Sequence, residues 1–397
     1  MNSSTVVLEK IAKISSGGTP DRDTPSYWGG DIPWVKTAQI QNCFINADDV
    51  DEWITPDGLK NSAAKMVPKG TILMAMYGQG KTRGQVAILG LDAAVNQACA
   101  AIELDAAVSR DYVYQQLLFR YQAIRALSNT GSQENLNAGL IREIGFPLPA
   151  RVEQDYVAGL LTNWDATIEK TEQLIAAKEI SQRGWMQKLV MDKLFPEHRL
   201  SEFVHRVNRK NVNGNGHPLT ISGRDGLISQ SHYFDKRIAA ETTEHYTQLK
   251  RGEFSYNKSY SAGYPYGAIK RLDAYDEGIV STLYLCFALN PNAALLSDYL
   301  IQFCEVGGFN HQIHKVAQEG ARNHGLLNVA ADDFFAMKLP VPPIEEQSRV
   351  VAILGDAGRE LALLRKSLYL LRQQKRGLMQ KLLTGQWRAK LPETEPA

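Results

Sequence analysis

The chain contains the same sequence twice, 193 residues apart. Residues 183–189 read RGWMQKL and residues 376–382 read RGLMQKL, so six of the seven positions are identical. The offset holds upstream without a gap, where the Pro-rich residues 146–149 match residues 339–342. Solenoid repeats have periods of about 20–50 residues, which is far shorter. The chain is therefore two copies of a whole module, an arrangement that suits a ligand read at two separated places.

Each copy predicts one long helix. Apolar residues recur at steps of four and three from Val157 and, in the same register, from Val350, which is the heptad seam of a coiled coil. A Pro-containing stretch precedes each helix, and Pro disfavours helix before it. Gly184 and Gly377 occupy equal positions inside the two patterns, which predicts close backbone approach or a bend there.

The repeat predicts four segments: residues 1–145 (mixed), 146–192 (helix), 193–340 (mixed) and 341–397 (helix and polar tail). We expect an α+β fold with two mixed α/β domains separated by two long spacer helices. The helices pair antiparallel as a coiled coil, because a long apolar stripe needs a partner, and the chain forms a pseudo-two-fold internal repeat. A helix of about 40 residues spans about 60 Å. The pair therefore acts as a ruler between two short sites, or else is an ordinary helical scaffold.

The two mixed segments share only a skeleton. In the first we expect strands over residues 71–77 and 85–89 and a helix over residues 111–127. Lys69-Gly70 and Gly84 of the first segment parallel Arg251-Gly252 and Gly267 of the second. The helices agree closely while the mixed segments do not, which predicts common scaffolding that carries domains of different specificity.

Composition excludes some classes of protein. No apolar run approaches the roughly 18 residues of a membrane span, and no secretory signal is visible at the N-terminus. The four cysteines are scattered, which favours reduced thiols and a cytoplasmic protein. The formal net charge is +1, so any nucleic-acid contact must use local basic stripes or share the phosphate load with a partner.

Motifs with catalytic meaning are missing. Gly78-Gln79-Gly80-Lys81-Thr82 looks like part of a P-loop, but Ala75 stands where that loop needs Gly. His311 and His314 lack the Glu and the nearby Cys ligands of a zinc site. The sequence contains no methyltransferase signature, GxGxxG, HExxH or GxSxG. A binding protein without catalytic residues, metal or cofactor is the better interpretation.

From about Leu8 to Gly385 the chain resembles the specificity subunit of type I restriction-modification enzymes. The resemblance rests on residues 14–20 (ISSGGTP), 27–35 (YWGGDIPWV) and Asn96-Gln97 in the first mixed segment and on residues 252–258 (GEFSYNK) in the second. Each helical segment adds Pro-Leu/Val-Pro, Glu-Gln and a helix that ends in Met-Gln-Lys-Leu.

The resemblance implies two target-recognition domains, each reading one half of a bipartite, asymmetric site in double-stranded DNA. It also implies that the spacer helices dock two modification subunits, which use S-adenosylmethionine to methylate adenine. Restriction subunits that use ATP and Mg²⁺ for translocation and cleavage join the larger complex. None of that chemistry is expected in this chain, and no membrane is expected as a partner.

Arg and Lys read guanine and Asn and Gln read adenine when loops carry them into a groove. The candidates in the first domain are Lys36, Gln79, Lys81, Thr82, Arg83, Gln133 and Asn135. Those in the second are Arg224, Lys258, Tyr260, Tyr264, Arg322, Asn323 and His324. Some of these side chains are expected only to contact phosphates or to be solvated loop residues. A coiled-coil assembly scaffold whose globular domains bind proteins is the alternative.

Overall fold

The computed structural model describes residues 5–78, 80–127, 135–191, 194–212, 214–223, 225–233, 243–260, 263–319 and 327–389. The chain divides into two compact units. Unit 1 comprises Met1–Glu172 with Lys366–Ala397, and unit 2 comprises Gln173–Arg365. Each unit therefore contains one mixed segment and part of both long helices.

Unit 1 is built around a five-stranded sheet in the order β2-β10-β7-β8-β4, antiparallel except for the parallel pair β4 and β8. Its strands are β2 (Ala12–Ser16), β4 (Cys43–Ile45), β7 (Ile72–Ala75), β8 (Val86–Leu89) and β10 (Cys99–Leu104). A second sheet has the order β5-β3-β9-β6, from β3 (Trp28–Val35), β5 (Trp53–Ile54), β6 (Met66–Val67) and β9 (Ala93–Val95). Unit 1 also contains β1 (Thr5–Val7), which pairs with β11 (Gly145–Pro147). Its short α-helices are α1 (Pro56–Lys60), α2 (Arg110–Phe119), α3 (Tyr121–Leu127) and α4 (Ala138–Arg142).

The strands predicted over residues 71–77 and 85–89 are confirmed as β7 and β8. Ile72 and Met74 face one buried cluster together with helix residues, whereas Leu73 and Ala75 face another. Successive side chains of a strand point to opposite faces. The sheet is therefore covered on both sides, which explains why these strands are uninterrupted apolar runs.

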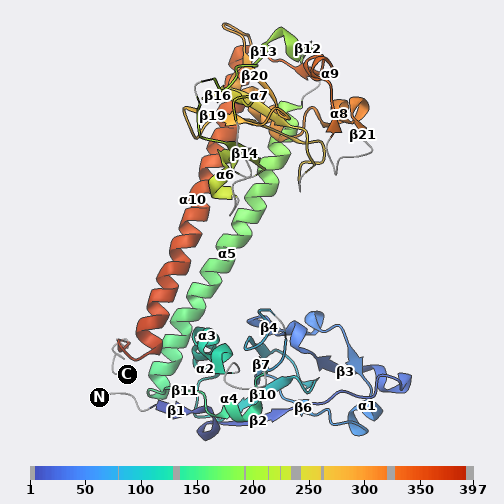
Figure 1. Ribbon diagram of the computed structural model, residues 1–397. Helices are drawn as coiled ribbons and strands as arrows, with labels where there is room; N and C mark the ends of the chain where they lie inside the picture. Colours follow the sequence, from blue (N-terminus) through green and yellow to red (C-terminus); the bar gives the residue numbers. More distant parts are fainter. Residues whose placement is uncertain are drawn as a thin grey trace. The chain divides into compact units, whose positions relative to one another are not determined.

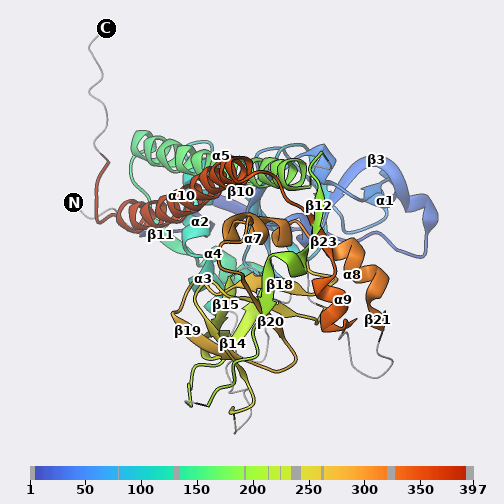
Figure 2. The same ribbon diagram turned by 90° about the horizontal axis from the view of Figure 1, so that it is seen from above.

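Unit 2 repeats this construction with a four-stranded antiparallel sheet in the order β13-β20-β17-β18. Its strands are β13 (Val204–Arg206), β17 (Phe254–Asn257), β18 (Ala268–Arg271) and β20 (Leu285–Leu289). Four strand pairs accompany this sheet. Strand β12 (Glu197–Arg199) pairs with β23 (Lys338–Pro340), and the two lie side by side in Figure 2. The other pairs are β14 (Leu219–Ser222) with β15 (Gly226–Ser229), β16 (Thr247–Lys250) with β19 (Glu277–Val280), and β21 (Gln318–Glu319) with β22 (Leu327–Asn328). The short helices are α6 (Gln230–Tyr233), α7 (Ser297–Glu305), α8 (Asn310–Val316) and α9 (Ala331–Phe335).

The backbone confirms the predicted similarity between the two mixed segments. The order β2-β10-β7-β8 of unit 1 equals β13-β20-β17-β18 of unit 2. Gly70 and Gly252 have φ values of 89° and 86°, and Gly84 and Gly267 have 83° and 80°. Glycine enters this left-handed region without a steric penalty. The matched glycines therefore mark the same turns of one fold.

The two long helices are α5 (Arg151–Val190) and α10 (Ile344–Leu383), each 40 residues long and continuous (Figure 1). Within unit 1, Arg388 of the chain after α10 pairs with Glu153 at 2.7 Å, and Arg372 pairs with Glu172 at 2.5 Å. Within unit 2, Arg365 pairs with Glu179 at 2.6 Å. Residue numbers rise along one helix of unit 1 as they fall along the other, so the antiparallel pairing is confirmed there.

The first turn of each long helix contains a buried glutamine, Gln154 in α5 and Gln347 in α10. In unit 1 the Gln154 side chain accepts a hydrogen bond from the Ser109 N–H (2.9 Å) and donates one to the Pro149 carbonyl (2.8 Å). In unit 2 the Gln347 side chain accepts from the Leu296 N–H (2.7 Å) and donates to the Pro342 carbonyl (2.8 Å). Both side chains are buried. The repeated Glu-Gln pair therefore joins each helix to its mixed segment.

Each unit also holds the end of the other helix through an equivalent tyrosine. Tyr112 donates to the Pro147 carbonyl (2.9 Å), and its partner Gln116 donates to the Leu383 carbonyl at the end of α10 (3.0 Å). Tyr299 contacts both the Pro340 carbonyl (3.3 Å) and the carbonyl of Val190 at the end of α5 (3.4 Å). Both units therefore join the start of one helix to the end of the other.

Two sequence expectations differ from the structure. The apolar pattern over residues 111–127 forms two helices, α2 and α3, because the backbone at Arg120 (φ −88°, ψ 6°) leaves the helical region. Close backbone approach at Gly184 and Gly377 is wrong, since a Cβ atom at either position would meet nothing within 4 Å among the described residues.

Candidate nucleic-acid interface

The loop between β7 and β8 carries three candidate residues that the structure describes, Lys81, Thr82 and Arg83. The carbonyl of Ala75 accepts from the Gly84 N–H (2.8 Å), and the Thr82 carbonyl accepts from the Gln85 N–H (3.0 Å). Gly78 has φ 134°, and a Cβ there would lie 2.8 Å from the Cβ of Thr82. The loop therefore folds back on itself, with Lys81 exposed and Thr82 and Arg83 partly exposed.

Asn135 lies beside this loop. The N–H of the next residue, Leu136, donates to the Met76 carbonyl at the end of β7 (3.1 Å), and the Asn135 side chain is exposed. The structure thus brings Asn135 to the same end of the sheet as Lys81, Thr82 and Arg83. An amide and two cations at one loop cluster have the donors and acceptors that base edges require.

Two further residues join this cluster and were missed by the sequence analysis. Tyr121, at the start of α3, donates its hydroxyl proton to the Lys81 carbonyl, and Arg125 donates to the Tyr121 hydroxyl (2.7 Å). The available signal was the spacing of four residues between Tyr121 and Arg125 within the predicted helix. Arg125 adds a third cation to the cluster.

Lys36 is held by acidic neighbours. It lies directly after β3, and its ammonium group contacts Glu52 and, at 3.1 Å, Asp51. The hydrogen bond to Glu52 is the largest of the effects that raise the pKa of Lys36. The two carboxylates thus neutralise the Lys36 charge within the protein, and this weakens its attraction to a phosphate or a base.

The loop between β17 and β18 occupies the equivalent place in unit 2. The N–H of Leu327 donates to the Lys258 carbonyl (2.9 Å), which reproduces the bond from Leu136 to Met76 in unit 1. Tyr260 is 65% exposed, whereas Lys258 is partly buried and its ammonium lies 3.4 Å from the Val329 carbonyl. Burial lowers the pKa of Lys258. Tyr260 is therefore the freer of the two for an external contact.

The other candidate of this loop, Tyr264, faces inward. Its hydroxyl lies 2.8 Å from the Gly223 carbonyl and 2.9 Å from the ammonium of Lys270. The remaining predicted residues lie outside the described residues: Gln79, Gln133, Arg224, Arg322, Asn323 and His324.

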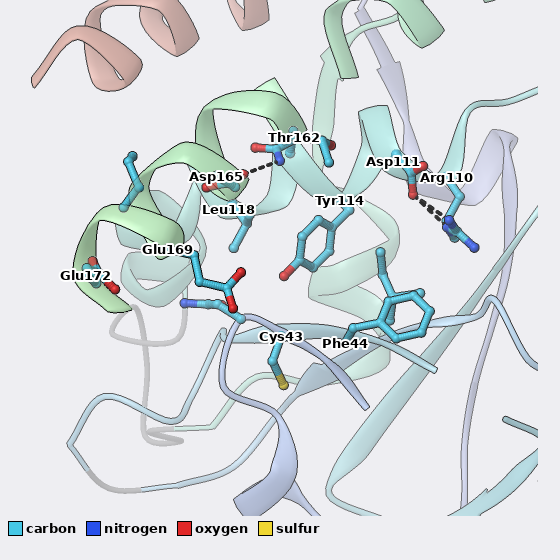
Figure 3. A pocket seen from close by; sticks show the side chains of 14 residues that line it. Cys43, Phe44, Arg110, Asp111, Tyr114, Leu118, Thr162, Asp165, Glu169 and Glu172 are labelled. Carbon is cyan, nitrogen blue, oxygen red and sulfur yellow. Dashed lines mark hydrogen bonds and ion pairs between the residues drawn. The ribbon is translucent and has the colours of Figure 1, made fainter. Parts of the chain in front are cut away.

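A cavity of about 510 Å³ lies in unit 1 between β4, α2 and the first half of α5. Figure 3 shows the Tyr114 ring in its middle, with Glu169 on one side and Cys43 and Phe44 on another. Asp165, at its wall, is paired with Lys375. No group of three or more His, Cys, Asp or Glu among the described residues could hold a metal ion.

None of the helices in the described ranges is long and apolar enough to cross a membrane.

Comparisons with known proteins point to one family. Residues 2–179 match the family model of the type I restriction modification DNA specificity domain. A curated relative, the type I restriction enzyme MjaIX specificity subunit of Methanocaldococcus jannaschii, is 28% identical over 167 residues. That match covers 41% of this chain and only 38% of the relative's length.

Two solved structures share the fold. The S subunit of a type I restriction-modification system from M. genitalium aligns with a TM-score of 0.55 at 15% identity, over 96% of both chains. The HsdS subunit from Thermoanaerobacter tengcongensis aligns with a TM-score of 0.52 at 13% identity, over 97% of both chains. The predicted fold class is confirmed.

Proposed function

Since residues 2–179 match the family model of the type I restriction modification DNA specificity domain, we propose that this chain is the DNA-reading specificity subunit of a type I restriction-modification complex. It reads a bipartite, asymmetric site in double-stranded DNA, with one half-site read by each unit. The observation that carries the proposal is the pair of equivalent loops, one after β7 and one after β17. Both are built on the same sheet order, and their side chains differ.

The chemistry of each loop suits a different half-site. In unit 1, Lys81, Arg83 and Asn135 offer donors to guanine and an amide to adenine. In unit 2, Lys258 and Tyr260 come from a loop with fewer cations. Equivalent backbones that carry unequal side chains are what an asymmetric bipartite site requires.

The helices α5 and α10 connect the two units. A continuous helix of 40 residues is about 60 Å long, and half-sites on one face of DNA recur about every helical turn. The helices therefore set the number of base pairs between the half-sites.

Partner subunits supply the rest of the complex. Large apolar side chains are exposed along both helices, including Ile180 (64%), Trp185 (50%), Leu363 (67%) and Tyr369 (62%). Exposed apolar surface of this kind marks protein contacts. Two modification subunits dock here with S-adenosylmethionine, and restriction subunits with ATP and Mg²⁺ complete the assembly. This chain takes no catalytic part and works in the cytoplasm.

The same exposed apolar side chains favour the second candidate, a coiled-coil scaffold whose globular units bind proteins. Footprinting of the complex with its modification subunits separates the two functions. The specificity subunit gives two protected tracts of defined sequence with a gap of fixed length. Protection without sequence preference, or none at all from an assembled complex, would favour the scaffold.

A further inference from the structure

Three polar side chains meet under the β17–β18 loop in unit 2. The Lys270 ammonium, whose side chain is 7% exposed, lies 2.6 Å from the Glu305 carboxylate. It also donates to the Tyr264 hydroxyl at 2.9 Å, and the other Glu305 oxygen lies 3.1 Å from that hydroxyl. We call Tyr264, Lys270 and Glu305 the unit 2 network.

The unit 2 network joins three separate segments. Tyr264 belongs to the β17–β18 loop, Lys270 to β18, and Glu305 to the end of α7. The Tyr264 hydroxyl also lies 2.8 Å from the carbonyl of Gly223, in the turn between β14 and β15. A Cβ atom on Gly223 would come within 2.7 Å of the Tyr264 ring, so this turn packs directly against the tyrosine.

The protonation states favour these bonds. Burial by itself lowers the pKa of Lys270, but attraction to Glu305 and the hydrogen bonds outweigh it and raise that pKa. Burial raises the pKa of Tyr264. At neutral pH the lysine is therefore charged and the tyrosine keeps its proton. Since a phenol has one proton, it donates to Gly223 or to Glu305 while it accepts from Lys270.

An ion pair with a buried lysine and a partly buried carboxylate is a poor choice for stability alone. The desolvation of two charges offsets most of their attraction, and well-packed apolar residues are often at least as stable. What the network does provide is fixed geometry, since each of its groups has its partners at defined distances.

We propose that Tyr264, Lys270 and Glu305 are positioning residues, which hold the β17–β18 loop and the β14–β15 turn in one register for reading a single half-site. The inference rests on the proposed function. It assigns Tyr264 a positioning role in place of the predicted contact with DNA. Tyr260, on the same loop, is exposed. It is then the side chain that the unit 2 network positions for contact with DNA.

Unit 1 holds its loop differently. There the β7–β8 loop is held by α3, because the Tyr121 hydroxyl donates to the Lys81 carbonyl and Arg125 donates to the Tyr121 hydroxyl. The unit 2 network, by contrast, is centred on the carboxylate of Glu305. Substitutions in the unit 2 network therefore affect one half-site and leave the other as an internal control.

The test uses the whole complex with its modification subunits. Methylation rates are measured on the cognate site and on sites with single base changes in either half. Tyr264→Phe is expected to lower discrimination in one half-site about tenfold, the effect of losing one hydrogen bond to a charged or buried group. Tyr266→Phe, a tyrosine of the same loop outside the network, is the matched control and keeps discrimination in both halves.

A second variant separates positioning from direct contact. The double substitution Lys270→Met with Glu305→Leu replaces the ion pair by apolar side chains and is expected to fold. Positioning predicts the same loss of discrimination as in Tyr264→Phe. If Tyr264→Phe alone changed discrimination while the folded double variant did not, Tyr264 would be a base contact and the inference would be overturned. Full discrimination in both variants would also overturn it. A wild-type complex without any base preference would instead refute the proposed function.

Discussion

Replacing Gln154 by Ala should loosen the start of α5 from its mixed segment. The substitution removes the partner of the buried Ser109 N–H and of the partly buried Pro149 carbonyl. A buried polar group without its partner costs about 1–3 kcal/mol, and a partly exposed one costs less because water replaces the bond. The loss in free energy of unfolding should therefore be about 2–4 kcal/mol for unit 1.

Hydrogen exchange of the full chain measures this loss locally, which matters because two units need not unfold as one. Amides of α2 (Arg110–Phe119) are expected to exchange faster in the Gln154→Ala variant, by the factor that corresponds to 2–4 kcal/mol at about 1.4 kcal/mol per tenfold. The matched control is Gln374→Ala, an exposed glutamine of α10 within the same unit. Its effect should lie within about 0.5 kcal/mol. Equal exchange in the two variants would refute the view that Gln154 joins helix and domain.

Four further predictions follow from particular residues. Arg83→Ala should weaken recognition of one half-site by about 1–3 kcal/mol in a binding assay if the side chain contacts a base, and an equal loss on both halves would contradict the modular reading. Gly184→Ala and Gly377→Ala should each raise the free energy of unfolding by about 1 kcal/mol in urea, because a Cβ meets only open space; a loss would indicate a hidden contact. Burial raises the pKa of Cys99 to about 12, so iodoacetamide at pH 8 should label the partly exposed Cys43 before Cys99. Peptide mass spectrometry measures the two labelling rates, and equal rates would contradict the burial of Cys99. Inserting one heptad into one long helix should change the length between the half-sites and keep their sequences, and unchanged spacing in a folded variant would argue against the ruler.

The long helices could be predicted because their signal is periodic and repeated. The heptad steps from Val157 and Val350 predicted helices whose observed ends, Arg151–Val190 and Ile344–Leu383, lie close to the expected segments. The sequence also marked Glu153-Gln154 and Glu346-Gln347 as a repeat. What it could not reveal was the chemistry, since the partners of Gln154 and Gln347 are backbone groups that the fold brings to them.

The candidate site was only partly predictable, because side-chain partners are set by tertiary contacts. Lys36 is a polar residue after a strand, and nothing local shows that Asp51 and Glu52 bind it. Tyr264 appeared to be an exposed loop residue, yet Lys270 holds it from β18. The loop after β7 was found from its glycines and cations, because positive φ and local charge leave a mark in the sequence itself.

Whether this chain reads a bipartite DNA site can be measured with a base-resolution methylation map of DNA from cells that express it with its modification subunit. We expect N6-methyladenine in both halves of one bipartite motif, with a spacer of fixed length, and its disappearance when this chain is deleted. A confirmed complex with an active modification subunit that leaves no such motif would contradict the claim that this chain reads DNA.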